Sequence, residues 1–172
     1  MSGTSQELIY RVMRQVEPPA APVEPVQWSM PGFAPMTRIA CSFADVPAAA
    51  LRERDQVRSR NGFIAIRRVR RMTLDQEFLS RHPDAQPIMI QANTFGPGKP
   101  AADIMVSPAQ MISPVPGRLP VARRATECLS MPGVFRRPET GLSYTIIELD
   151  APAEVCAEGL WCSTATRDSA TH

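Results

Sequence analysis

Prolines are spread along most of the chain, and they limit the length of every element that it can form. The 172 residues include 18 prolines and only 9 glycines. Because proline lacks a backbone N–H and clashes with the preceding turn of a helix, long helices are excluded over most of the sequence. The pattern instead predicts many extended segments separated by turns. With 44% apolar residues, a chain of this length can still build one hydrophobic core.

Short β-prone stretches lie between these prolines at close spacing. The expected strands are 37–43, 55–59, 63–72, 87–91, 104–106, 111–112, 119–121, 144–149 and 154–157. Asn61-Gly62 predicts a hairpin, and residues 45–47 predict a turn. Two short helical segments are also expected, one capped by Thr73 and ending at Arg81, the other at 123–129. Many short strands with frequent turn signals predict an all-β domain.

The first thirty residues differ from the rest. A capping-box pattern at 4–7 precedes an apolar stripe at helical spacing, formed by Leu8, Ile9, Val12, Met13 and Val16. A proline-rich stretch follows and predicts a stiff, extended linker. We therefore expect an amphipathic helix with its linker at 1–31, a folded domain at 32–164 and a flexible tail at 165–172. The helix either packs back on its own domain or docks a protein partner.

Standard catalytic and metal-binding motifs are absent from the sequence. It has no G-x-S-x-G, P-loop or G-x-G-x-x-G motif, and its two histidines and four cysteines are scattered. We therefore expect no cofactor and no metal. No run of eighteen apolar residues predicts a membrane span. Residues 1–10 lack a signal-peptide pattern, which predicts a cytoplasmic location by default and leaves export without a leader open.

Arginine is concentrated between residues 52 and 71. Eight arginines against Glu53 and Asp55 leave a local charge of +6 in this stretch. On a strand, Arg68 and Arg70 would share one face, and Arg67 and Arg71 the other. The four side chains either protect an exposed edge strand or bind a phosphate or acidic partner. The lack of interleaved aromatic residues and the overall charge of +2 argue against nucleic acid.

The order of several segments resembles the bacterial Hint (Hedgehog/intein) domain family. The matching stretches are FAPMTRI at 33–39, LRERDQV at 51–57, NGFIAIR at 61–67, PIMI at 87–90, FGPGKP at 95–100, DIMVSP at 103–108, LSMPGV at 129–134 and AEGLW at 157–161. The resemblance extends over residues 32–164. The resemblance implies an all-β, pseudo-twofold horseshoe or disk of short strands with one or two short helices.

Members of that family cut their own backbone. A cysteine at the first position of the domain attacks the preceding carbonyl, and a histidine in a T-x-x-H or S-P-x-H motif protonates the departing nitrogen. In this sequence Gly32 stands at the place of the nucleophile, and Gln110 ends the Ser107-Pro108-Ala109-Gln110 motif. Two further positions where the family tends to carry histidine hold Ile146 and Pro152. The resemblance therefore implies a degenerate site with no intact catalytic residue.

Three functions follow from these patterns. The first is a degenerate Hint-like domain that serves as a non-enzymatic scaffold, binding or regulatory module, with a protein partner at the N-terminal helix or the arginine-rich face. The second is a self-cleaving domain that uses a displaced nucleophile, Ser29 or Cys41. The third is an arginine-rich module that binds polyanions through Arg67, Arg68, Arg70 and Arg71.

Overall fold

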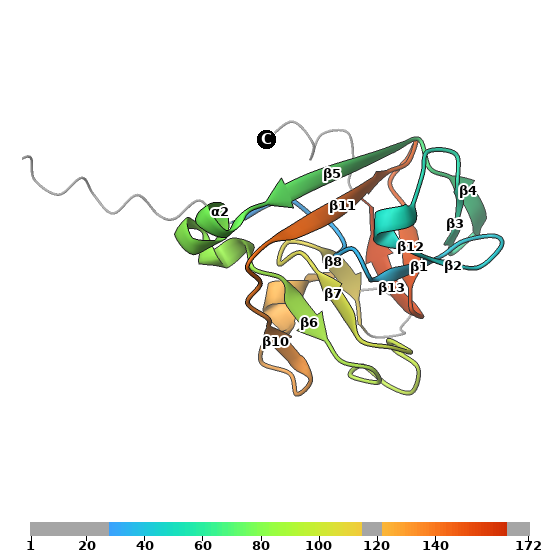
Figure 1. The fold of residues 1–172 in the computed structure, drawn as a ribbon. Coiled ribbons are helices and arrows are strands. Elements are labelled where there is room, and N and C mark those ends of the chain that lie inside the picture. The colour runs from blue at the N-terminus through green and yellow to red at the C-terminus, as the bar shows by residue number, and fades with distance from the viewer. Residues whose placement is uncertain (1–27, 115–121, 165–172) are drawn as a thin grey trace, which may run out of the picture.

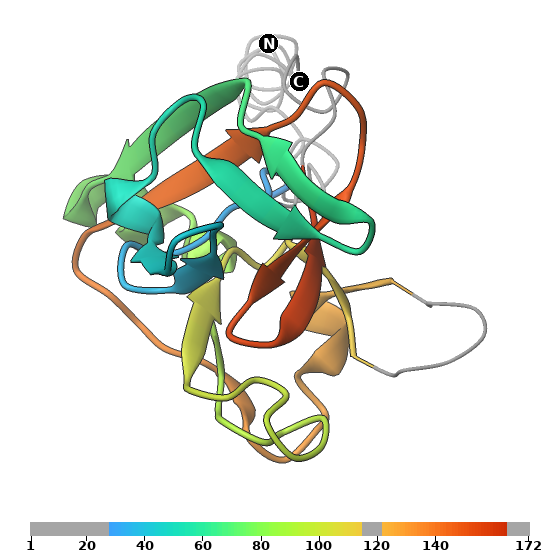
Figure 2. The same cartoon turned by 90° about the vertical axis from the view of Figure 1, so that its right-hand side faces the viewer.

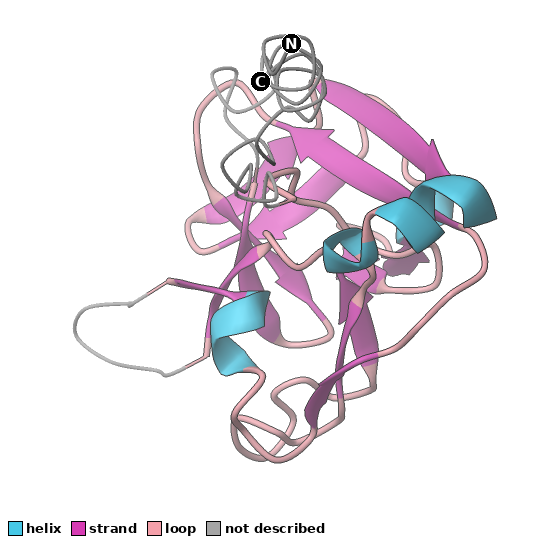
Figure 3. Ribbon diagram, turned by 90° about the vertical axis from the view of Figure 1, so that its left-hand side faces the viewer, coloured by secondary structure: helices cyan, strands magenta, loops and turns pink. Residues whose placement is uncertain are grey.

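Strands dominate the computed structural model, which describes residues 28–114 and 122–164. Figure 3 shows the few short helices among them. The strands are β1 (Arg38–Ala40), β2 (Asp45–Pro47), β3 (Gln56–Ser59), β4 (Gly62–Ala65), β5 (Arg68–Leu74), β6 (Ile88–Ile90), β7 (Ile104–Val106), β8 (Met111–Ser113), β9 (Arg123–Arg124), β10 (Val134–Arg136), β11 (Leu142–Glu148), β12 (Glu154–Ala157) and β13 (Leu160–Ser163). The helices are α2 (Gln76–Arg81) and three single 3₁₀ turns, η1 (Ala48–Ala50), η2 (Pro83–Ala85) and η3 (Ala125–Cys128). The predicted all-β class is confirmed.

The strands form three antiparallel groups (Figures 1 and 2). The largest runs in the order β2-β1-β12-β13-β8-β9, with the β3–β4 hairpin attached to β12. A second sheet has the order β10-β6-β7. The third is the long ribbon of β5 and β11, which pair along their whole length from Leu74–Leu142 to Arg68–Glu148.

One main hydrophobic core joins these groups. Strand residues from the large sheet and from the β6–β7 pair meet in it, and Ile39, Val57, Ile88 and Ile112 are completely buried. Phe33, only 2% exposed, bridges Val106 of β7 and Thr145 of β11. The segment just before β1 is therefore built into the centre of the domain.

The stretch predicted as a single strand at 63–72 is interrupted. Residues 66–67 separate β4 from β5, because Ile66 turns its side chain into the core and its backbone bonds to Asp55 and Arg54. The predicted hairpin is present, with the two residues 60–61 joining β3 to β4. Residues 45–47, predicted as a turn, form β2 instead because they pair with β1.

The short helix begins later than its predicted cap. Thr73 lies inside β5, where it pairs with Ser143, and Asp75 caps α2 by accepting a hydrogen bond from the Phe78 N–H. The helical prediction for 123–129 is only partly right, since Arg123–Arg124 pair with β8 before η3 begins. β10 and β13 were not expected at all.

Several predictions lie outside the described residues. These are the N-terminal helix and most of its linker at 1–27, the strand expected at 119–121, and the tail at 165–172. Among residues 28–114 and 122–164, no helix has the length and apolar character needed to cross a membrane.

Candidate functional site

The segment from Trp28 to Phe33, called the leading segment below, is fixed to the domain at its first residue. The Trp28 backbone N–H donates to Asp84 Oδ2 at 2.8 Å, and its indole Nε1–H donates to Ser107 Oγ at 3.0 Å. The indole also contacts the rings of Phe78 and Tyr144, with centroids 5.9 and 6.1 Å away. Polar and aromatic contacts together therefore hold the chain that leads into Gly32.

Ser107, at the end of β7, connects three points of this segment. Its hydroxyl accepts from Trp28, donates to the Met30 carbonyl and also receives the Ala109 N–H at 3.3 Å. Its backbone N–H donates to the Gly32 carbonyl at 2.9 Å. The side chain is completely buried. Ser107 therefore acts as a clamp on the residues just before Gly32.

Gln110 lies directly beside Gly32. Its Oε1 accepts the Gly32 N–H at 3.0 Å, and its Nε2 donates to the carbonyls of Met111 at 3.0 Å and Ser163 at 2.7 Å. The side chain is 1% exposed. Both amide hydrogens and the carbonyl oxygen are thus engaged, and the side chain links the leading segment, β8 and the end of β13.

A side chain at Gly32 would be crowded and its backbone strained. Its φ of +153° lies in a region that favours glycine. A Cβ placed there would lie 3.0 Å from Tyr144 Cβ, 3.3 Å from the Thr145 carbonyl oxygen and 3.5 Å from Ile146 Cγ1. β11 therefore fills the space that a nucleophilic side chain at position 32 would need.

The structure brings together four of the five positions named from the resemblance. Gly32, Ser107 and Gln110 are hydrogen bonded as described, and Ile146 packs with Met30 in a small apolar cluster beside Gly32. Pro152 is exposed in the loop between β11 and β12, with no described contact to the other four. The side chains of Ile146 and Gln110 thus both lie next to the backbone of Gly32.

The two fallback nucleophiles have different surroundings. Ser29 is exposed within the leading segment. Cys41 follows β1 and bridges Val57, and burial together with Asp55 and Asp45 raises the pKa of its thiol to about 11. A thiol with that pKa is protonated at neutral pH and is a weak nucleophile. The other three cysteines are buried, and all four are free thiols.

Three of the four candidate arginines contact acceptors of the domain itself. Arg67 forms an ion pair with Asp150 at 3.7 Å, and Arg70 with Glu148 at 3.5 Å. The Arg71 guanidinium donates to the carbonyls of Ala49 and Leu51 at 2.9 and 2.7 Å. Arg67 lies between β4 and β5, so it does not share a strand face with Arg71 as predicted. Arg68 is exposed on β5.

Sequence reasoning missed the side chains that hold the site in place. Trp28 was assigned to the linker, and neither Tyr144 nor Thr145 was singled out. A tryptophan placed just before the domain is a usable signal, because a large aromatic residue gains little from exposure to water. Nothing in the sequence marks Tyr144, whose hydroxyl donates to the Ala85 carbonyl at 2.7 Å. Within the described ranges, no group of three His, Cys, Asp or Glu side chains could hold a metal.

Comparisons with known proteins agree with this architecture. A DnaB intein from Synechocystis sp. PCC 6803 superimposes with a TM-score of 0.54 at 7% identity, covering 79% of this chain and 99% of the intein. The MchDnaB-1 intein gives a TM-score of 0.51 at 8% identity, covering 77% and 99%. At such identities the likeness shows the fold alone. No curated protein matches the sequence.

A match to a family model identifies the family, which the similarity to the intein structures alone does not. The model described as the Hint domain matches residues 31–169, well over half of the chain. The match begins one residue before Gly32 and includes Ser107, Gln110 and β11. This protein therefore belongs to the Hint domain family.

Proposed function

We propose that this Hint domain has lost self-cleavage and serves as a non-enzymatic scaffold, a binding or regulatory module. The hydrogen bond from the Gly32 N–H to Gln110 Oε1 is the observation that carries the proposal. It joins the two positions that, by the resemblance, would hold the nucleophile and the acid. Neither residue present can perform its part of the reaction.

The nucleophile is the first missing part. An acyl shift needs a hydroxyl or thiol on the residue that follows the cleaved carbonyl, because only that geometry closes a five-membered ring. Gly32 has no side chain, and β11 would crowd one placed there. The covalent route through the Pro31 carbonyl is therefore closed.

The general acid is the second missing part. The departing amide nitrogen must receive a proton, and a carboxamide cannot supply one near neutral pH. Gln110 also uses both of its amide hydrogens on the carbonyls of Met111 and Ser163. Loss of a general acid alone slows such reactions by roughly 10²- to 10⁴-fold.

A displaced nucleophile is the competing explanation. Ser29 could attack the Trp28 carbonyl, but the Trp28 indole and the adjoining backbone are held by Ser107 and Asp84. Cys41 has the raised pKa described above. Among the described residues no hydrogen bond joins a histidine to Ser29 or Cys41, and the His82 ring packs against Phe78 at the end of α2.

Mass spectrometry of the purified full chain tests the proposal. We expect the intact mass to persist through days of incubation, with and without hydroxylamine, which would cleave a thioester or ester. A fragment that begins at Ser29, Gly32 or Cys41 would overturn it. If such a fragment forms, Ser29→Ala and Cys41→Ala identify the nucleophile, and Ser130→Ala, which alters another exposed serine, is the matched control.

A further inference from the structure

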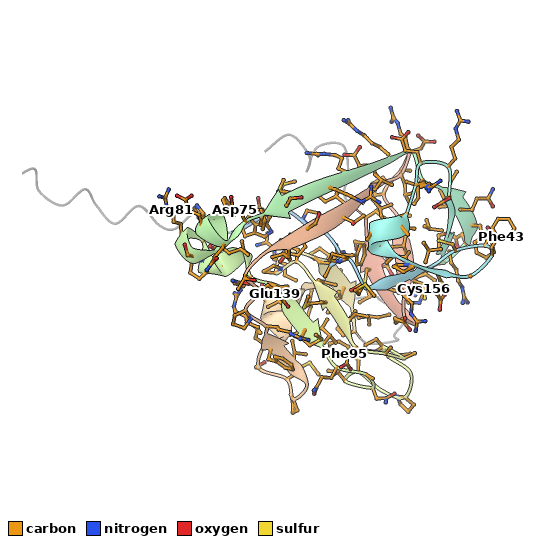
Figure 4. All side chains as sticks on the ribbon, in the orientation of Figure 1. Phe43, Asp75, Arg81, Phe95, Glu139 and Cys156 are labelled. Atoms are coloured by element: carbon orange, nitrogen blue, oxygen red, sulfur yellow. The ribbon has the colours of Figure 1, made fainter. Side chains whose placement is uncertain are left out.

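A second site lies a few residues beyond Gly32, where the surface is open. A groove of about 370 Å³ is formed by residues 34–37, β6, β7 and the start of β11. Its apolar walls include Met36, Met89, Met105 and Leu142. Glu139 also lines the groove, and Figure 4 shows this residue where the chain approaches β11, close to β6.

The groove has the character of a docking surface for an apolar helix face. Met36 is 80% exposed, although its side chain is large and apolar. Polar groups surround the apolar walls, with Asp103 on one side and the Arg137–Glu139 ion pair on another. Exposed apolar surface with a polar rim is typical of an interaction site, and methionine adapts its shape to a partner.

Three segments of the chain lie outside the described residues, and only one suits this groove. The last eight residues, 165–172, are small and polar. Residues 115–121 are tied at both ends, to β8 and β9. Residues 1–27 carry the stripe of Leu8, Ile9, Val12, Met13 and Val16, which would form one apolar face of a helix.

The N-terminal stripe can reach the groove. The Trp28 ring lies 6.1 Å from the ring of Tyr144, which is two residues along β11 from Leu142 in the groove wall. Two residues of strand add about 7 Å. The linker at 17–27 spans roughly 34 Å when extended like polyproline. The extended linker is therefore longer than the straight-line separation of its anchor from the groove wall.

The stripe also needs a surface to pack against. A helix over 8–16 would have little more than two turns, and isolated helices of that length are marginal in water. Tethering by a short linker raises the effective concentration of the stripe at its own domain to the millimolar range. Docking on the same chain is therefore favoured over association with a second copy.

We propose that residues 8–16 form an amphipathic helix that docks its apolar stripe in the Met36 groove of the same chain. A protein partner of either surface would then have to displace this helix. The inference does not depend on the loss of cleavage, so its failure would leave the proposed function standing.

Photocrosslinking of the full chain tests the docking. Replacing Met36 with p-benzoylphenylalanine places a reactive group at the groove. We expect peptide mapping of the monomer band to show a crosslink to residues 8–16. The same group in place of Phe43, which is fully exposed between β1 and β2 and does not line the groove, is expected to give none.

Each other outcome overturns the proposal. A crosslink in a dimer band that joins isotopically different chains would assign the groove to a second copy. No crosslink to 8–16, or an equal one from position 43, would exclude docking. Val12→Asn should lower the yield by up to about tenfold, because it removes one buried apolar side chain, whereas Arg14→Asn on the opposite helix face should not.

Discussion

Gly32 and Met36 lie four residues apart, yet their surroundings are opposite. Gly32 is enclosed by β11 and hydrogen bonded to Gln110, and the nearby Ser107 is completely buried. Met36 is 80% exposed at the edge of an apolar groove. The position that by the resemblance would hold the nucleophile is thus crowded and hydrogen bonded, whereas an accessible apolar surface lies close to it in sequence. Function at this end of the molecule is therefore expected to depend on binding.

Adding a side chain at Gly32 should have the largest effect on stability. Gly32→Ala should destabilise the fold by about 2–4 kcal/mol, because the new Cβ meets Tyr144 and Thr145 and the φ of +153° is strained for alanine. Urea unfolding measures the change.

Gly62→Ala is the matched control, since Gly62 also has a positive φ, +121°, but nothing lies within 4 Å of its added Cβ. We expect the control to lose only about 1 kcal/mol. Equal losses in the two variants would show that β11 does not close the space at Gly32.

Removing the carboxamide should have the next largest effect. Gln110→Leu leaves the Gly32 N–H and the Met111 and Ser163 carbonyls without their partner, and should cost about 2–3 kcal/mol. Gln56→Leu, at an exposed position on β3, should change the free energy of unfolding by less than about 0.5 kcal/mol. An unchanged free energy of unfolding for Gln110→Leu would contradict the role given to its hydrogen bonds.

Alkaline pH should weaken the fold through Cys41. The folded pKa of about 11 exceeds the ordinary value of 9.0, so the protonated thiol is favoured in the folded state. That contribution is fully present below pH 9 and is lost as the pH rises toward 11. Denaturant midpoints measured across this range should fall less steeply for Cys41→Ser than for the parent, and Ser42→Ala should leave the slope unchanged. Identical slopes for all three would refute the assignment.

A charged side chain in place of the exposed Met36 should have little effect on stability. Met36→Glu is expected to change stability by less than about 0.5 kcal/mol, because its side chain is largely exposed. The same substitution at Met89, 8% exposed in the floor of the groove, serves as the contrast and should be clearly destabilising. If Met36→Glu were as costly as Met89→Glu, the groove would not be an open surface.

The arginine cluster should give the smallest effect. Because Arg67, Arg70 and Arg71 already contact acceptors of the domain, we expect weak retention on heparin that ends at low salt. Arg68→Gln should barely alter the elution. Tight binding with a steep salt dependence would instead favour the polyanion-binding function.

Much of the fold could be predicted from the sequence, because local interactions determine it. Asn61-Gly62 predicts a hairpin through its turn geometry, and the short apolar runs between prolines predict strands. Elements that form only by pairing with other segments of the chain could not be predicted in this way. β10 forms because it pairs with β6, and residues 45–47 extend because they pair with β1. Asp75 replaced Thr73 as a cap because pairing with β11 carries β5 beyond Thr73.

The candidate site followed the same division. The resemblance named Gly32, Ser107 and Gln110, and the structure places them in contact. It could not name Trp28 or Tyr144, because their roles depend on residues 79 and 59 positions away along the chain. Such pairings arise only when β7, η2 and β11 assemble.

The anchoring of Trp28 fixes the point at which the preceding polypeptide joins the described part of the domain. Its backbone is bonded to Asp84 and its ring rests beside α2, so residue 28 cannot swing freely on the surface. A reporter protein fused directly to this tryptophan would accordingly be joined to the domain at one fixed place. Trp28 thus offers a ready-made attachment point that is held by contacts with the domain.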